Sequence, residues 1–541
     1  MTRFRYSKHT LSIPAILLSA LLAGCGGSSG GKEPTPPVIN PDGGGNTTPT
    51  WTAGVYEPAS QFINQCSAPR SGTDPYTNEA YPDKAGSVFL EKMYLRSFSN
   101  ETYLWYDELP DPNPNSYNSV ISYFDILRTT QVTDSGRDKD EFHFVDTYEN
   151  YMQESQSGLT GGYGINWAFI ETYAPRDLKV AYTETASGAE LAGVERGDKL
   201  LKINAIDFVN TNASADIDAI NEALFYPQMG KSYRFTFETR TGSTKTVTLT
   251  AAQIALSPVK NIRVIENQGR KVGYLQHNQF ISAAQSGLIQ AFSQFSTAGI
   301  DELVIDMRYN GGGLIYQSAQ LGYMIAGSGS QNRVFETLAY NDKRSAYNES
   351  INFVPRAIDW DQSVFTDPLP YVGLSKVYIL STSGTASASE SLINALRGID
   401  VEVILIGGQT RGKPYGFLPQ QNCGLVYFTV QFKGVNEKNF GDYADGFIPT
   451  PASNIVTDMG VDAKVPGCTV ADDFSQPLGD EQEAMLAAAL QYMQDGTCPA
   501  VPVKRNLNAP QSLQGRGLAI EQPFHPLRQG SIYTDIRDLT Q

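Results

Sequence analysis

Residues 302–313 read Glu302-Leu303-Val304-Ile305-Asp306-Met307-Arg308-Tyr309-Asn310-Gly311-Gly312-Gly313. The apolar half of this stretch is typical of a buried strand, the glycines mark a turn, and residues 314–325 have helical periodicity. The same order returns from residue 376, where an apolar segment runs into Gly384-Thr385-Ala386-Ser387-Ala388-Ser389-Glu390. A third apolar segment, 401–406, runs into Gly407-Gly408-Gln409-Thr410-Arg411-Gly412-Lys413. Strands that alternate with helices predict a mostly parallel sheet over about residues 259–500.

The three predicted strands each end at a segment that can take part in catalysis. These segments are the glycine loop, the turn that carries Ser387, and the turn that carries Lys413. Right-handed crossovers place the carboxyl ends of parallel strands at one edge of a sheet, which is where ligands bind. We therefore expect the three segments to meet.

Ser387 and Lys413 together predict a hydrolase with a Ser–Lys dyad. A serine hydroxyl is a weak nucleophile until a base removes its proton, and a lysine is a base only when burial brings its pKa down from about 10.4. A tetrahedral intermediate also needs donors for its oxyanion. The backbone N–H groups of Gly312 or Gly313 and of Ala388 are suited to this, because glycine permits a close backbone approach.

The segment around Ser387 also fits a structural interpretation. Ser387 and Glu390 have the spacing of a capping box, in which the serine hydroxyl accepts a helix N–H and the glutamate reaches back to the cap. The segment alone does not decide between a helix cap and a nucleophile. Its occurrence with the glycine loop and Lys413 at three strand ends favours the nucleophile.

The N-terminus predicts export and a lipid anchor. Basic residues precede an apolar run over 11–22, which is too short for a membrane span and fits a secretory signal. The run ends at Leu22-Ala23-Gly24-Cys25, which resembles a bacterial lipobox, so residues 1–25 are expected to be a lipoprotein signal with Cys25 as the lipidated residue. Residues 26–55 are rich in Gly, Pro, Ser and Thr and predict a disordered tether. Gly26 after the cysteine favours the outer membrane by its resemblance to lipoprotein sorting signals.

Composition excludes some partners. Lys and Arg number 41 against 57 Asp and Glu, and the net charge of −16 argues against nucleic acid and against anionic membrane surfaces. The four histidines show no metal-ligand spacing, so we expect neither a metal nor another cofactor. Membrane contact is expected through the lipid anchor alone.

Four cysteines besides Cys25 lie in the expected exported part, namely Cys66, Cys423, Cys468 and Cys498. An even number in an oxidising compartment predicts two disulfides, with three possible connectivities. Cys468 and Cys498 flank a predicted helix over 479–494, which makes their pairing plausible.

Two further domains are expected before the parallel sheet. Residues 56–156 contain helical patterns over 91–98 and 118–128 and predict a small helical domain. Residues 157–258 contain short alternating strands and resemble a PDZ domain. Gly162, Tyr163, Gly164 and Ile165 are similar to its carboxylate-binding loop, and Gly197-Asp198-Lys199-Leu200-Leu201-Lys202-Ile203-Asn204 is similar to its hairpin. Convergent backbone N–H groups in such a loop bind the terminal carboxylate of a peptide, while a strand edge pairs with its backbone.

The catalytic segments resemble those of the C-terminal processing, or tail-specific, serine peptidases, in an exported lipoprotein subgroup. The resemblance rests on Asp306 to Gly313, on Thr385-Ala386-Ser387-Ala388-Ser389-Glu390 and on Gly412-Lys413, and it covers about residues 157–498. It implies a multidomain α+β protein with a crotonase/Clp-protease-like peptidase domain over 259–500 and a tail over 501–541. It also implies Ser387 as nucleophile, Lys413 as general base, Gly312 with Ala388 as oxyanion hole, and a periplasm-facing endopeptidase of polypeptides, with any adaptor protein unidentified.

One position departs from the family pattern. Many members carry a glutamine four residues after the lysine, where it orients the lysine, but Phe417 stands there in this chain. Gln420, Gln421 and Gln431 are possible substitutes. A catalytically inactive peptide-binding lipoprotein is the main alternative, and a Ser-His-Asp hydrolase with His277 as base is a weaker one, because no G-x-S-x-G elbow accompanies it.

Overall fold

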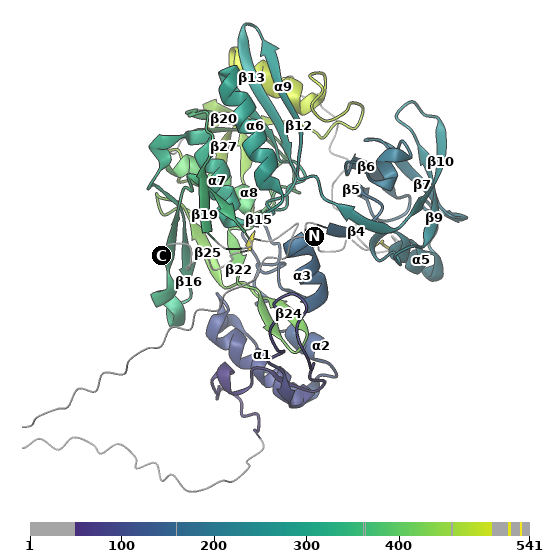
Figure 1. Cartoon of the computed structure of the whole chain (residues 1–541), viewed down its shortest axis with the longest axis vertical. Coiled ribbons are helices and arrows are strands. Elements are labelled where there is room, and N and C mark those ends of the chain that lie inside the picture. Colours follow the sequence, from purple (N-terminus) through teal and green to yellow (C-terminus); the bar gives the residue numbers. More distant parts are fainter. Residues whose placement is uncertain are drawn as a thin grey trace, which may run out of the picture. The chain divides into compact units, whose positions relative to one another are not determined.

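The computed structural model describes residues 49–157, 159–360, 362, 364–455, 458–499, 518–520 and 531–532. The chain divides into two units, Met1–Thr50 and Trp51–Gln541, and the following concerns the second (Figure 1). Cys25, the lipobox and the tether up to residue 48 lie outside the described residues, as does most of the 501–541 tail. The tether was predicted to extend to residue 55, but the Val55 carbonyl accepts a hydrogen bond from buried Arg96 at 2.8 Å, so the folded unit begins earlier.

The first region contains helices and three short strands among its described residues. Its long helix α1 (Val88–Thr102) begins at Ser87, whose hydroxyl accepts from the Leu90 N–H, as an N-cap should. The other elements are β1 (Gln65–Cys66), β2 (Lys84–Ala85), α2 (Val120–Phe124), β3 (Phe144–Thr147) and α3 (Tyr148–Ser157). Strand β3 pairs with β24 (Leu425–Phe428), which in turn pairs with β23 (Gln420–Asn422). The region predicted to be a helical domain is therefore joined by a shared sheet to the segment that follows Lys413.

The second region is a sheet with its own core. Its strands follow the order β10-β9-β7-β6-β5, with β5 at an edge. The elements are β5 (Ile165–Glu171), β6 (Asp177–Thr183), α4 (Gly188–Leu191), β7 (Lys199–Ile203), β8 (Ile206–Asp207), α5 (Ser214–Phe225), β9 (Ser232–Glu238) and β10 (Thr244–Thr250). A separate pair, β4 (Leu159–Gly162) with β11 (Ala252–Ala255), brings the two ends of the region together.

The third region has a seven-stranded central sheet, in the order β12-β13-β14-β20-β21-β27-β26. Its strands are β12 (Val259–Asn267), β13 (Arg270–His277), β14 (Glu302–Asp306), β20 (Lys376–Ser381), β21 (Glu402–Gly407), β26 (Ile448–Thr450) and β27 (Lys464–Thr469). Pairing is parallel from β13 to β26, and β12 alone is antiparallel to its neighbour. The mostly parallel sheet expected from the alternating pattern is therefore present.

Alternate residues of the central strands pack on opposite faces of the sheet. Ile305 and Ile379 share a core with helices α6 (Ala284–Ala298), α7 (Ile315–Ala326) and α8 (Ala388–Gly398), while Val304 and Tyr378 share another with α9 (Ala484–Asp495). Because side chains alternate along a strand, a sheet covered on both faces needs continuous apolar strands, and these are what the sequence shows.

A smaller sheet lies beside the first, in the order β15-β28-β22-β25-β16-β17. Its strands are β15 (Gly313–Leu314), β16 (Val334–Tyr340), β17 (Glu349–Asn352), β22 (Tyr415–Phe417), β25 (Phe432–Val435) and β28 (Ser531–Ile532), and β18 (Arg356–Asp359) pairs separately with β19 (Val364–Pro368). Strand β15 begins within the glycine loop and β22 begins two residues after Lys413, so this sheet starts where two of the predicted motifs end.

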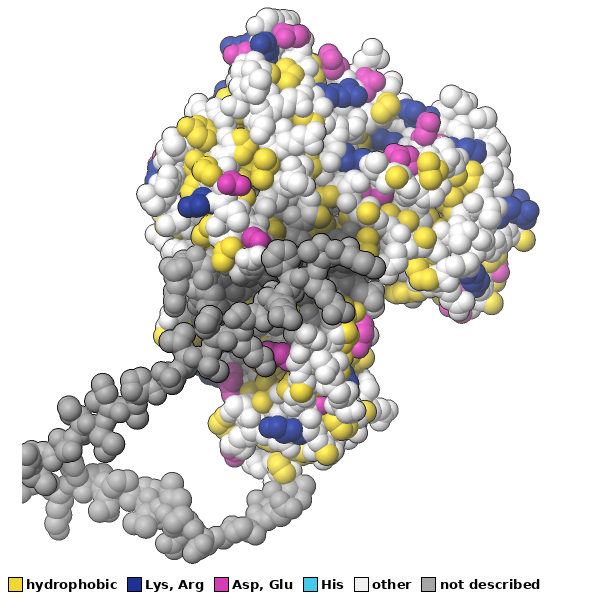
Figure 2. Space-filling model, viewed as in Figure 1, with side chains coloured by type: hydrophobic (Ala, Val, Ile, Leu, Met, Phe, Trp, Pro, Cys, Tyr) yellow, Lys and Arg dark blue, Asp and Glu magenta, His cyan; other side chains and the backbone are white. Residues whose placement is uncertain are grey.

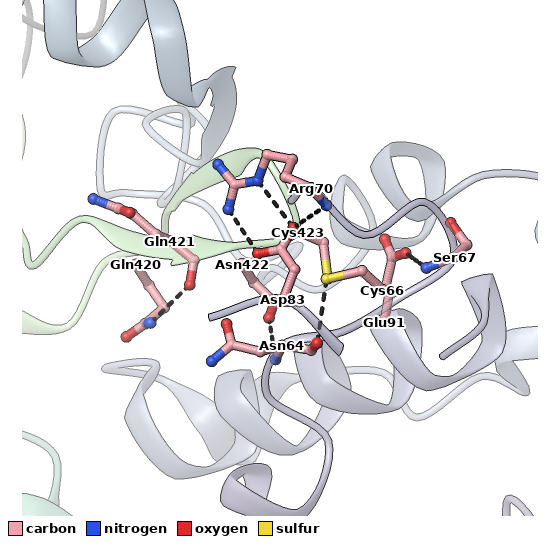
Figure 3. The surroundings of a disulfide bond; sticks show 10 residues. All are labelled: Asn64, Cys66, Ser67, Arg70, Asp83, Glu91, Gln420, Gln421, Asn422 and Cys423. Atoms are coloured by element: carbon pink, nitrogen blue, oxygen red, sulfur yellow. Dashed lines mark hydrogen bonds and ion pairs between the residues drawn. A yellow bond between two sulfur atoms is a disulfide. The ribbon is translucent and has the colours of Figure 1, made fainter. Parts of the chain in front are cut away.

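Two disulfides, Cys66–Cys423 and Cys468–Cys498, join the four cysteines. The first links the N-terminal region to the turn between β23 and β24, and Figure 3 shows its surroundings. Beside it the Asn64 N–H donates to the Asn422 side chain at 2.8 Å. The bond therefore reinforces the junction that β3 and β24 already make.

Two surface properties bear on partners. On the face in Figure 2, Lys and Arg side chains lie among Asp and Glu side chains and do not gather into one patch. Within the described ranges, none of the helices combines the length and apolar character that a membrane crossing requires.

Candidate active site

The three strand ends meet, as their order along the sheet requires. Strands β14, β20 and β21 are consecutive neighbours, and the turns that follow them are hydrogen-bonded to one another. The Ala386 N–H donates to the Asn310 carbonyl at 3.1 Å, the Thr385 hydroxyl donates to the Met307 carbonyl at 2.8 Å, and the Arg411 N–H donates to the Thr385 carbonyl at 2.9 Å. The serine turn is thus held between the glycine loop and the lysine turn.

Ser387 has an unusual backbone conformation at the start of α8. Its φ is 60° and its ψ is −116°, whereas an ordinary N-cap residue has β-region angles. Such angles are sparsely populated by residues with a side chain and are found where function holds a residue in place. A strained strand-to-helix turn also presents the nucleophile in the α/β-hydrolases. The Glu390 side chain also accepts from the Ser387 N–H, as in the capping box that the sequence predicted, so the cap is present together with these unusual angles.

Glu390 is a buried carboxylate that holds the backbones of both turns. Its Oε2 accepts from the Ser387 N–H at 2.9 Å and from the Lys413 N–H at 2.8 Å. Its Oε1 accepts from the Thr410 hydroxyl at 2.6 Å and from the Gly412 N–H at 2.7 Å. Burial raises the pKa of Glu390, while the four donors oppose this by stabilising the charged form. One oxygen atom thus fixes the backbone of Ser387 and the backbone of Lys413 together.

Lys413 is enclosed by aromatic side chains. It is 1% exposed, and its Nζ lies 4.0 Å from the centre of the Phe417 ring and 4.8 Å from that of Phe142. Burial lowers the pKa of Lys413 well below its usual value, because the ammonium form loses its hydration. The charge of Asp140 acts in the opposite direction. A lysine in this state is suited to accept a proton near neutral pH.

Phe142 and Asp140 come from the N-terminal region, about 270 residues before the lysine. Asp140 is buried, and its carboxylate accepts from the Tyr103 hydroxyl at 2.7 Å and from the Phe142 N–H at 3.0 Å. These bonds hold the short segment 140–142 in place over the lysine. The N-terminal region is therefore part of the wall around Lys413, which the sequence had not indicated.

Two of the three glutamines considered as substitutes donate their side-chain N–H groups to backbone carbonyls. Gln431 donates to the Leu418 carbonyl at 2.9 Å, and Gln420 donates to the Gln421 carbonyl at 3.1 Å. Phe417, which replaces the expected glutamine, is buried against the lysine. The structure thus surrounds Lys413 with the aromatic side chains of Phe142 and Phe417.

The predicted oxyanion donors lie next to the serine. A Cβ atom placed on Gly312 would lie 2.7 Å from the Ser387 Cβ and 3.0 Å from the Ala388 nitrogen, and the φ of Gly312 is +111°. Only glycine tolerates both the contact and the angle. The Gly312 N–H donates to the Asn310 side-chain oxygen at 3.0 Å, so in this structure that donor is engaged within its own loop.

The predicted peptide loop lies in a different place from the dyad. Tyr163 is buried and its hydroxyl donates to the Ala223 carbonyl of α5 at 2.9 Å, while Gly164 has a φ of +80°. A cleft of about 1090 Å³ extends from residues 161–170 to residues 382–384, which begin the serine turn. Ser387 and Lys413 do not line it. The cleft therefore joins the loop to the start of the serine turn, and the loop and the dyad are separate sites.

Two other predictions concern histidines and metals. His277 is buried, packs edge-on against Phe280 at 4.4 Å, and has its pKa lowered to about 3 by burial, so it is neutral. In the part of the chain that the structure describes, no group of three or more His, Cys, Asp and Glu side chains is placed to hold a metal ion.

Known families match the two parts of the chain that meet at the dyad. The model described as "Peptidase family S41" matches residues 271–421, and that described as "Peptidase S41 N-terminal domain" matches residues 95–142. The chain carries peptidase family S41 domains. The S41 match contains Ser387 and Lys413, and the N-terminal match ends at Phe142.

Relatives of these S41 domains are carboxyl-terminal-processing proteases. That of Picosynechococcus sp. is 32% identical over 264 residues, which are 48% of this chain and 56% of that protein. That of Synechocystis sp. is 30% identical over 242 residues, which are 44% of this chain and 49% of that protein. The chain thus spans about half the length of the curated relatives it matches. A solved Bacteroides fragilis protein assigned to the S41 proteases is 24% identical, with a TM-score of 0.54 over 77% of this chain and 99% of that one, and this likeness concerns the fold.

Proposed function

We propose that this chain is a serine endopeptidase that hydrolyses polypeptides with Ser387 as nucleophile and Lys413 as general base. The observation that carries the proposal is the shared carboxylate oxygen of Glu390, which accepts from the backbone N–H of both residues. The angles of Ser387 and the lowered pKa of Lys413 support it. A crotonase/Clp-protease-like description of the peptidase region is part of the same proposal.

In the proposed reaction, the Ser387 hydroxyl passes its proton to neutral Lys413 while its oxygen bonds to the scissile carbonyl carbon. The C–N bond then breaks, and Lys413 returns the proton to the leaving amine. Water subsequently attacks the acyl-enzyme, with Lys413 again taking and returning one proton. Enclosure by Phe142 and Phe417 serves this cycle because it keeps the lysine neutral between turnovers.

The oxyanion is stabilised in this proposal by backbone N–H groups of Ala388 and Gly312. Ala388 is the first residue of α8, and N–H groups in the first helical turn have no partner within the helix. Gly312 contributes after its N–H exchanges the Asn310 oxygen for the developing oxyanion. The close approach of Gly312 to Ser387 supports this assignment.

Substrates are proposed to be engaged through the second region, which is PDZ-like in this interpretation. Among the described residues, strand β5 lies at the edge of its sheet, and α5 packs near it through Phe169 and Phe225, whose rings are 6.0 Å apart. A C-terminal peptide that added to β5 would place its carboxylate at Gly162, Tyr163, Gly164 and Ile165. The cleft described above would lead its preceding residues toward the serine turn.

The place of action is proposed to be the periplasmic side of the outer membrane, with Cys25 lipidated and periplasmic polypeptides as substrates. The support for this lies in the sequence, which has a short apolar run that ends at a lipobox-like cysteine. Two disulfides are in keeping with an oxidising compartment.

The test compares three forms of Trp51–Gln541, namely wild type, Ser387→Ala and Lys413→Ala, on an unfolded, fluorescently labelled polypeptide. We expect hydrolysis by wild type and a loss of at least about a thousandfold in both variants, as removal of a catalytic nucleophile or base produces. Undiminished hydrolysis by either variant would exclude the dyad. A folded wild type that binds peptides without hydrolysing them would favour the alternative of an inactive peptide-binding lipoprotein.

A further inference from the structure

The smaller sheet contains a strand from the far end of the chain. Strand β28 (Ser531–Ile532) lies between β15 and β22 and is parallel to both. Ser531 pairs with Gly313 on one side and with Gly416 on the other, and Ile532 pairs with Leu314 and Phe417. Figure 1 labels β15 and β22 in the same part of the fold, and in the sheet β28 lies between them. The tail thus supplies the strand that joins these two.

The two flanking strands belong to the proposed active site. Strand β15 begins one residue after Gly312, and β22 begins two residues after Lys413. Neighbouring strands lie about 4.8 Å apart, so the backbone of Ser531 lies beside Gly313, one residue after the oxyanion glycine, and beside Gly416, three residues after the base. A substrate peptide that approached the dyad as an extended strand would meet these same two edges.

The same tail has a second anchor on the PDZ-like region. The buried Arg176 side chain donates to the Leu518 carbonyl at 2.6 Å, and the Ile520 N–H donates to the Thr172 carbonyl at 3.2 Å. Ile520 is 4% exposed and packs in the core of that region. Ten residues separate Ile520 from Ser531, and a chain of that length can span up to about 35 Å. One tail therefore contacts both the proposed peptide-binding region and the proposed catalytic region.

We infer that the gap between β15 and β22 is a peptide site that binds an extended chain by strand addition on both sides, and that the tail segment at Ser531–Ile532 is its resident occupant. Backbone pairing with two edges makes such a site tolerant of sequence, which suits an enzyme of polypeptides. A tethered segment has an effective concentration in the millimolar range, so it competes with free substrate. The competition rests on the proposed function, whereas the binding of the tail does not. The hydrogen bond from the Gly312 N–H to the Asn310 side chain agrees with a site that holds no substrate.

The experiment releases the tail after folding. A recognition sequence for a site-specific protease is placed within residues 521–530 of Trp51–Gln541, and the cut fragment is removed by dialysis. In the Ser387→Ala background, a labelled peptide of residues 527–541 is expected to bind the cut protein at least tenfold more tightly than the uncut protein, by fluorescence anisotropy. The control peptide carries Ser531→Pro and Ile532→Pro, which remove the backbone donors, and it is expected to bind at least tenfold more weakly.

Activity gives the second readout. With Ser387 present, tail release is expected to lower KM for an unfolded polypeptide at least tenfold with little change in kcat, and the added peptide should restore the KM competitively. Equal binding of the peptide to cut and uncut protein, or no binding to either, would overturn the inference. Tight binding to cut protein that hydrolyses nothing would uphold the tail site and instead refute the proposed peptidase function.

Discussion

Replacement of Glu390 by glutamine tests whether one carboxylate positions both members of the proposed dyad. In the least costly orientation, the amide oxygen takes the place of Oε2 and still accepts from the Ser387 and Lys413 N–H groups. The amide nitrogen then takes the place of Oε1. The Gly412 N–H loses its acceptor there, whereas the Thr410 hydroxyl can rotate and accept from the amide. An unsatisfied buried N–H costs about 1–3 kcal/mol, and each retained bond loses its charge assistance, so we expect unfolding to become easier by about 2–4 kcal/mol.

The same change has a predictable effect on the pH profile. The charge of Glu390 favours the protonated form of Lys413, so its removal lowers the pKa of Lys413 further. Because neutral lysine is the active base, activity rises as pH increases through this pKa, and the acid limb of kcat should move to lower pH. Plateau kcat is expected to fall about 10- to 100-fold, which corresponds to about 1.4–2.8 kcal/mol of lost positioning.

The assay is steady-state hydrolysis of an unfolded polypeptide from about pH 5 to 10, with urea unfolding of the same samples. The matched control is Glu336→Gln. Glu336 is also buried and accepts from the Ser391 hydroxyl of α8 at 2.8 Å, but burial raises its pKa to about 7, so its neutral form is already well populated. We expect the control to keep kcat within about twofold. A Glu390→Gln enzyme with normal kcat, or an acid limb displaced to higher pH, would refute the reasoning.

Three other changes probe separate parts of the site. Gly312→Ala places a methyl group 2.7 Å from the Ser387 Cβ at a φ of +111°, so kcat should drop at least about a hundredfold while peptide binding, measured by anisotropy, persists. Phe417→Leu opens Lys413 to water and raises the pKa of the lysine toward its usual value, so the acid limb of kcat should move to higher pH. An acid limb at the same pH as in the wild type would show that it does not report the titration of Lys413. Cys423→Ser removes a bond that closes a separation of 357 residues, so the free energy of unfolding should fall by about 2–5 kcal/mol in urea titrations. Reductant should lower the stability of the wild type by this amount plus the contribution of the second disulfide, and that of the variant by the contribution of the second disulfide alone.

Much of the catalytic sheet was predictable from local pattern. The apolar segments before the glycine loop, Ser387 and Lys413 are strands, and they are neighbours in the sheet. The prediction worked because parallel strands must place their carboxyl ends at one edge, so three sequence-distant turns had to converge. Glu390 was seen only as a capping residue, since its bonds to Gly412 and Lys413 depend on a turn that lies on another strand.

The sequence by itself determined the three strand-and-turn segments and pointed to the residues proposed for the chemistry, because strand, turn and glycine patterns act over a few residues and can be interpreted locally. Only the tertiary structure decided what surrounds Lys413, which cysteines pair, and where the tail lies. Phe142 packs against Lys413, Cys66 is bonded to Cys423, and Ser531 pairs with Gly313. The two residues of each pair are more than 200 positions apart in the sequence. Such contacts depend on the packing of whole regions against one another, and a strand of two residues has no periodicity that would predict it.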